Sequence, residues 1–274
     1  MKLQFLVSAV NEEVKTLAER MNLQADAIVV NQCGINDYQE YEHRPEPGSS
    51  EMSNPACRIR CYSFAERGVG LSRNNCLMRA DREISVFADE DIVYYPGAAQ
   101  AIEKEFAAHP EADMLLFNMD VPADRATYHI REFGRVRWYN CGRYPTYSFA
   151  ARTEKLRQAN VSFSLLFGGG ARYSNGEDSL FLSDCLKAGL KVYKVPVTIG
   201  KENGRPSTWF HGYNEKFFYD RGVLYRFLYR KLALPMAVRF LLKLRKTAFG
   251  PESQLTVKQA FDLMCRGIRM EESV

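Results

Sequence analysis

Short apolar runs alternate with segments of helical periodicity over the first 120 residues, and this alternation constrains the fold more than any other feature. Apolar runs at 3–10, 25–30, 84–88 and 114–119 predict buried strands, and apolar residues recur at helical spacing between 14 and 21. Strands that alternate with helices form a mostly parallel sheet with helices on both faces. We therefore expect an α/β protein, Rossmann-like in its first half.

The remaining elements follow from local signals. Asn11 is predicted to cap the first helix, and residues 36–56 are predicted to form a polar loop because they contain Pro45, Pro47 and Gly48. Further strands are expected at 58–64, 147–151 and 191–199, and further helices at 71–80, after Pro96-Gly97 and at 178–188.

An acidic triplet, Asp89-Glu90-Asp91, directly follows the apolar run 84–88. Residues i and i+2 of a strand point to the same side, so the two aspartates are expected to converge. Converging carboxylates repel each other unless a cation lies between them. Carboxylate oxygens suit Mg²⁺ or Mn²⁺ shared with substrate phosphates. Ligands of such sheets bind at the carboxyl ends of the strands, where this triplet is expected.

Four motifs occur in order along the chain: Ser8–Glu12, Gly70–Asn74, Phe87–Asp91 and Gly176–Asp178. With this order and context, the sequence resembles a bacterial family 2 glycosyltransferase of the GT-A fold, over roughly residues 3–215. The resemblance implies a glycosyltransferase domain at 1–215, with a nucleotide-binding half at about 1–120 and an acceptor half at about 121–215. Residues 216–274 would form a basic, amphipathic helical extension.

The resemblance also implies roles for individual residues. Asp178 matches the catalytic base, Asp91 the metal ligand, and Asp89 the acid that contacts the donor ribose beside the metal. Ser8, Asn11 and Arg73 match nucleotide-sugar positions of the family, and Asn31 and Gln32 are expected to contact the nucleotide-sugar as well. His211 would be a further metal ligand, or otherwise an ordinary surface or half-buried histidine.

Acceptor contacts are expected from Gly169, Gly170, Glu177 and Trp209. The glycines could equally form a plain loop, Trp209 could be a core residue, and Asp178 could cap the helix that follows it.

Two positions depart from the family pattern. Val10 stands where an aromatic residue often stacks on the base, and Asn31-Gln32 stand where an aspartate usually reads the base. These departures leave the choice of nucleotide open. An amide carries both a donor and an acceptor and can still pair with a pyrimidine edge, and a UDP-sugar is the leading expectation for the donor.

The expected chemistry is transfer of a sugar from a nucleotide-sugar to a glycan or lipid-linked acceptor, in surface-polysaccharide synthesis. A divalent metal at Asp91 would neutralise the leaving diphosphate, and Asp178 would take the acceptor proton. Members of the family generally invert the anomeric centre, so inversion is expected here. One alternative is a sugar-phosphate nucleotidyltransferase, but residues 8–13 lack the glycine-rich loop that such an enzyme needs. The other is a non-catalytic glycan-binding relative, which would lack the acids that are present here.

A basic segment follows the predicted domain. Residues 216–246 contain nine Lys and Arg against one acid, Asp220, and therefore carry +8. Such a segment, with interleaved aromatic and leucine residues, is typical of a helix on an anionic membrane; a helix packed on the core is the alternative.

The whole chain carries only +4, which does not indicate nucleic-acid binding. Seven scattered cysteines favour a reduced compartment, so we expect a cytoplasmic protein, in peripheral contact with the inner face of the membrane if the segment binds lipid.

Overall fold

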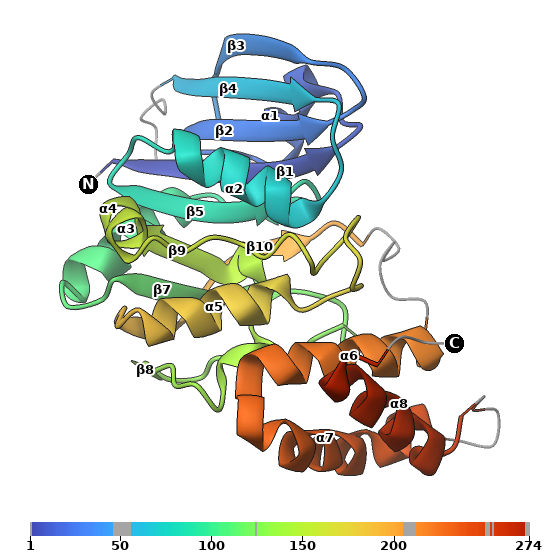
Figure 1. Ribbon diagram of the computed structural model, residues 1–274. Helices are drawn as coiled ribbons and strands as arrows, with labels where there is room; N and C mark the ends of the chain where they lie inside the picture. The colour runs from blue at the N-terminus through green and yellow to red at the C-terminus, as the bar shows by residue number, and fades with distance from the viewer. Residues whose placement is uncertain are drawn as a thin grey trace.

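A ten-stranded mixed sheet forms the centre of the molecule in a computed structural model, which describes residues 2–45, 56–123, 125–204, 212–249, 253 and 255–271 (Figure 1). The strand order is β3-β4-β2-β1-β5-β9-β7-β10-β6, with β8 paired to β10. The strands are β1 (Leu3–Val10), β2 (Asp26–Gln32), β3 (Asp37–His43), β4 (Cys57–Phe64), β5 (Ile84–Asp89), β6 (Ile92–Tyr94), β7 (Met114–Asp120), β8 (Gly134–Arg135), β9 (Phe149–Arg152) and β10 (Val192–Glu202). Strands β4, β2, β1 and β5 run parallel, so their carboxyl ends meet at one edge.

Helices cover both faces of this sheet. They are α1 (Val14–Arg20), α2 (Val69–Arg79), α3 (Ala98–Ala108), α4 (Thr153–Ala159), α5 (Glu177–Lys187), α6 (Glu215–Tyr229), α7 (Ala233–Ala248) and α8 (Val257–Arg269), with short 3₁₀ turns at 141–143, 146–148 and 230–232. Helices α1 and α3 pack on one face, and α2, α4 and α5 on the other. Successive strand residues point to opposite faces, so Phe5 and Val7 lie in the first core and Leu6 in the second.

The last three helices form a separate apolar cluster at one end of the sheet (Figure 1). Helices α6 and α8 cross at Gly222 and Gly267, where backbone meets backbone. A Cβ on Gly222 would lie 2.2 Å from the carbonyl oxygen of Met264, and one on Gly267 would lie 2.1 Å from that of Tyr219. Only glycine permits this approach. Among the described residues, no helix is long and apolar enough to span a bilayer.

Helix α6 also holds the loop that leads into α5. The Asp220 carboxylate accepts hydrogen bonds from the backbone N–H and the hydroxyl of Ser174, at 2.8 and 2.7 Å. A Cβ on Gly176 would lie 2.6 Å from the Leu224 side chain. The C-terminal helices therefore support the start of α5 directly.

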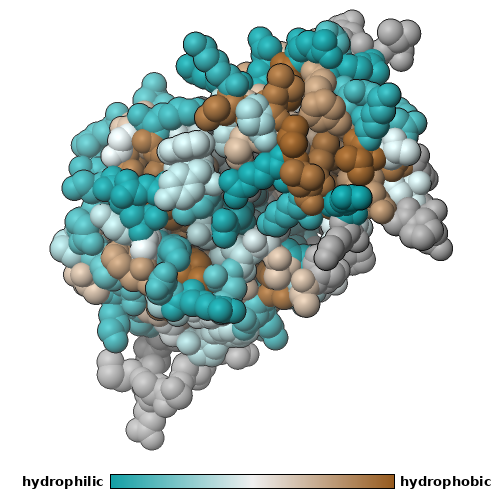
Figure 2. Space-filling model, turned by 90° about the horizontal axis from the view of Figure 1, so that it is seen from below, coloured by the Kyte–Doolittle hydropathy of each residue, from teal (hydrophilic) through white to brown (hydrophobic). Residues whose placement is uncertain are grey.

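The basic segment differs in detail from the predicted membrane helix. Phe217, Phe218, Leu224 and Tyr225 are buried inside the cluster, so α6 packs on the protein. Exposed apolar residues appear instead on α7, and Figure 2, seen from the side where α7 lies in Figure 1, shows brown residues gathered between teal ones.

Two local expectations are wrong. Residues 37–43 are strand β3, which pairs antiparallel with β4 from Asp37↔Ser63 to His43↔Cys57, so the predicted loop is partly a strand. Asn11 does not cap α1: it has a left-handed backbone with φ 54°, and the helix begins after Glu13.

Candidate active site

Arg73 joins three carboxylates from distant parts of the chain. Its guanidinium lies on α2 and donates to Asp89 at 2.8 Å, to Glu177 at 3.0 Å and to Asp178 at 3.0 Å. Asp89 ends β5, whereas the other two acids open α5. The Arg73 side chain is only 5% exposed and lies against the Phe163 ring. This cluster brings together the predicted donor-binding acid and the predicted base at the carboxyl end of β5.

The electrostatics of the cluster follow from burial. Burial lowers the pKa of Arg73, but the charges of Asp89, Asp178 and Glu177 outweigh this effect, so its pKa lies above the ordinary value. Burial, reinforced by the neighbouring Asp178, raises the pKa of Glu177 to about 7, against the pull of Arg73. Near neutral pH, Glu177 therefore lies close to the midpoint of its titration, while Arg73 stays charged.

Replacing Glu177 by Gln is expected to change the pH dependence of stability. The pKa of Glu177 is higher in the folded state than in the unfolded state. The protonated side chain therefore contributes to folding stability in full below pH 4.5, and this contribution is lost as pH rises through about 7. The free energy of unfolding of Glu177→Gln, measured relative to wild type, should therefore be higher at pH 8 than at pH 5 by on the order of 2 kcal/mol. Urea unfolding at both pH values measures this difference, and equal differences would contradict the raised pKa.

Asp178 is held by a second partner that the sequence did not indicate. The hydroxyl of Thr146 donates to Oδ1 of Asp178, the same oxygen that accepts from Arg73. Within the described residues, no hydrogen bond reaches Oδ2 of Asp178. Thr146 lies in a 3₁₀ turn within an Arg- and Tyr-rich stretch, and its sequence carries no signal for this role. One carboxylate oxygen is therefore fixed and the other remains available to an incoming group.

The acidic triplet is arranged differently from the strand prediction. Asp89 is the last residue of β5, but Glu90 and Asp91 form the turn before β6. The alternation of side chains along a strand therefore does not determine the direction of the Asp91 side chain. Burial, with the charge of Asp89 next to it, raises the pKa of Glu90 to about 7. The described residues contain no group of three His, Cys, Asp or Glu side chains arranged to hold a metal. Two aspartates nevertheless fit Mg²⁺ or Mn²⁺, because such ions commonly take one or two carboxylates together with substrate phosphates.

The predicted nucleotide loops lie beside this cluster. The Ser8 hydroxyl bonds to that of Ser72 at 2.8 Å. The Asn31 amide pairs with the backbone of Glu12, at 3.1 Å to its N–H and 2.9 Å to its carbonyl. The Gln32 amide makes a matching pair, both at 3.1 Å, with the backbone of Gly68. In this structure the two amides thus fix the loops that begin α1 and α2.

The glycine run packs on the start of α2. The Gly169 carbonyl accepts from the Val69 N–H at 2.9 Å, and a Cβ on Gly170 would lie 3.0 Å from the Gly68 nitrogen. A Cβ on Gly168 would lie 2.7 Å from the Glu177 carboxyl carbon. These contacts give the glycines a packing role. The other predicted acceptor residue, Trp209, and the predicted metal ligand His211 lie outside the described residues.

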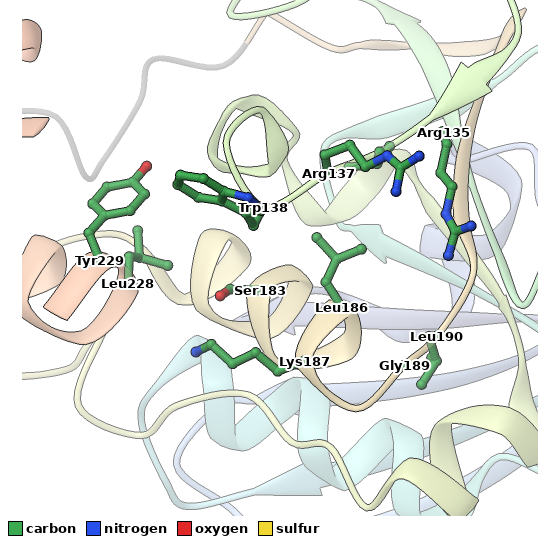
Figure 3. Close-up of a pocket in the computed structure, with 11 residues that line it drawn as sticks. Arg135, Arg137, Trp138, Ser183, Leu186, Lys187, Gly189, Leu190, Leu228 and Tyr229 are labelled. Carbon is green, nitrogen blue, oxygen red and sulfur yellow. The ribbon is translucent and has the colours of Figure 1, made fainter. Parts of the chain in front are cut away.

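A separate cavity of about 380 Å³ opens between β8, α5 and the end of α6 (Figure 3). Arg135, Arg137 and Lys187 line it with Trp138 and Tyr229, and it contains none of the three carboxylates bound to Arg73. Trp138 is 55% exposed. Cations beside an exposed aromatic ring suit an anionic carbohydrate, which both kinds of side chain can contact.

Comparisons with known proteins identify the fold. No protein-family profile matches the sequence, and no curated protein matches it. The crystal structure of S. aureus TarS in complex with UDP-GlcNAc superposes with a TM-score of 0.63 at 15% identity, covering 98% of this chain and 82% of that one. The complex of TarS with UDP superposes with a TM-score of 0.57 at 16% identity, covering 93% and 76%. The chain therefore has the GT-A fold, with a helical extension at its C-terminus.

Proposed function

We propose that this protein is a glycosyltransferase that moves a sugar from a nucleotide-sugar to a glycan or lipid-linked acceptor. One observation carries the proposal: Arg73 joins Asp89 of β5 to Asp178 of α5 at the edge where a GT-A sheet binds its ligands. The structural neighbours bind UDP-GlcNAc and UDP, which supports a UDP-sugar as the donor.

The proposed reaction assigns a role to each acid. Asp178 accepts the proton of the acceptor hydroxyl, through the oxygen that Arg73 and Thr146 leave available. The acceptor oxygen then bonds to the anomeric carbon, while the bond to the diphosphate breaks and its electron pair leaves with the nucleotide. Attack opposite the leaving group inverts the anomeric centre.

The proposed metal is Mn²⁺ or Mg²⁺, held by Asp91 and Asp89. When bound, it would neutralise negative charge on the departing diphosphate. Arg73 already neutralises part of the carboxylate charge and keeps Asp89 in place before any ligand binds. Surface-polysaccharide synthesis is the proposed setting.

A nucleotide screen tests this function. UDP with Mn²⁺ is expected to raise the melting temperature, whereas GDP, CMP and dTDP should raise it less; a ligand at 100 times its Kd stabilises the native state by about 2.7 kcal/mol. Asp91→Ala should remove the metal-dependent part of the shift, and Asp262→Ala, at an exposed position on α8 away from the sheet, should keep it. A shift of equal size without metal would contradict the metal assignment, and no shift with any nucleotide would contradict the transferase.

A further inference from the structure

Helix α7 carries an apolar stripe that the protein core does not cover. Leu234, Val238 and Leu242 are 48, 44 and 67% exposed, and their spacing of four residues puts them on one face. The neighbouring face of the helix buries Ala237 and Leu241 in the C-terminal cluster. The apolar arc of this helix is therefore wider than its packing requires, which is typical of a helix with a second apolar contact.

Positive charge borders the stripe. Arg239 and Lys243 each follow a stripe residue by one position, and Arg245 lies near its C-terminal end; all three are exposed. The sequence from 221 to 251 contains eight Lys and Arg and no Asp or Glu. In Figure 2 the brown residues on this side of the molecule lie between teal ones.

We infer that this face of α7 docks on an anionic membrane surface. An amphipathic helix with a basic border lies in the plane of the interface, with its apolar side chains among the acyl chains and its cations at anionic headgroups. A second copy of this chain fits less well, because a two-fold contact would bring the same cations of both copies together. The inference extends the proposed function, since it places the transferase where a lipid-linked acceptor would lie.

Vesicle co-sedimentation of the full chain tests the inference without donor or acceptor, so its result is independent of the transferase proposal. The protein should bind phosphatidylcholine vesicles that contain phosphatidylglycerol at least about tenfold more tightly than pure phosphatidylcholine vesicles. High salt should weaken the binding, because 1 M salt shortens the screening length to about 3 Å.

Matched variants distinguish binding through the α7 stripe from non-specific hydrophobic binding to vesicles. Leu234→Gln with Leu242→Gln should weaken vesicle binding at least about tenfold, while Met78→Gln, at 68% exposure on α2, should leave it unchanged. Lys243→Gln should weaken it about fivefold, and the exposed Lys15→Gln on α1 should not. Melting temperatures confirm that each variant is folded.

Three outcomes would overturn the inference: equal binding to neutral and anionic vesicles, no binding to either, or stripe variants that bind like wild type. Sedimentation velocity of the same variants gives a further check. If the wild-type protein is a dimer that the stripe variants dissociate, then a second copy covers this face.

Discussion

Asp178→Asn is expected to lose sugar transfer while nucleotide binding remains. The asparagine oxygen can still accept hydrogen bonds from Arg73 and Thr146, so the local structure should persist. The amide cannot take a proton from the acceptor, however, and general-base catalysis contributes about 10²–10⁴ in rate. We therefore expect kcat to fall by roughly this factor, with the thermal shift from UDP and Mn²⁺ unchanged.

A control on the same helix isolates this effect. The Asp184 side chain is 48% exposed on α5 and, among the described residues, pairs only with Lys187, at 2.9 Å. Asp184→Asn removes a carboxylate of the same kind and should keep kcat within about twofold of wild type. The assay measures release of nucleotide from the donor that the screen identifies. Transfer by Asp178→Asn within tenfold of wild type would assign the proton to another group.

Arg73→Met is expected to destabilise the fold by about 3–5 kcal/mol, because it leaves the buried Glu177 and the half-buried Asp89 and Asp178 without their cation. Glu177 and Asp178 are adjacent in sequence, and within the part of the chain that the structure describes Asp89 is linked to them through Arg73. Without the guanidinium, Asp89, Asp178 and the partly ionised Glu177 repel each other in a site that is only partly exposed to water. Urea unfolding at pH 7 measures the loss.

The pH dependence of the stability of Arg73→Met distinguishes the loss of charge neutralisation from the loss of side-chain packing. Without Arg73 the pKa of Glu177 should rise further, so Glu177 becomes fully protonated as pH falls and no longer repels its neighbours. The difference from wild type should therefore shrink between pH 7 and pH 5. Arg79→Met on the same helix, where Arg79 lies over the Tyr62 ring, should cost about 1 kcal/mol at both pH values. A pH-independent loss for Arg73→Met would indicate lost packing alone.

The buried strands were predictable because burial leaves a pattern in the sequence. The runs at 3–10 and 114–119 are strands β1 and β7 as expected, since both faces of a covered parallel sheet demand apolar residues. Strand β3 left no such pattern. Its seven residues are exposed or half-buried, and it is held by backbone pairing with β4 at the edge of the sheet, where polar residues are common.

The acidic residues of the candidate site could be predicted from the sequence, but the ion pairs that join them through Arg73 could not. Asp89 and Asp178 were found from motif order, but no pattern revealed that Arg73 would bind both, because the three residues meet only when α2 and α5 pack on one face of the sheet. Thr146 was missed for the same reason. Asn31 and Gln32 were predicted to contact the nucleotide-sugar. In the structure their amides bond to the backbone of Glu12 and Gly68, and these contacts depend on the folded loops.

The glycine pair at the crossing of α6 and α8 limits how this sequence can diverge. Gly222 and Gly267 must change together or not at all, because any side chain at either position would separate the two backbones. Related chains too distant for alignment of their catalytic motifs should therefore keep both glycines, or lose both along with this helical arrangement. This paired signature would group such sequences by their C-terminal helices, independently of any residue that touches a sugar.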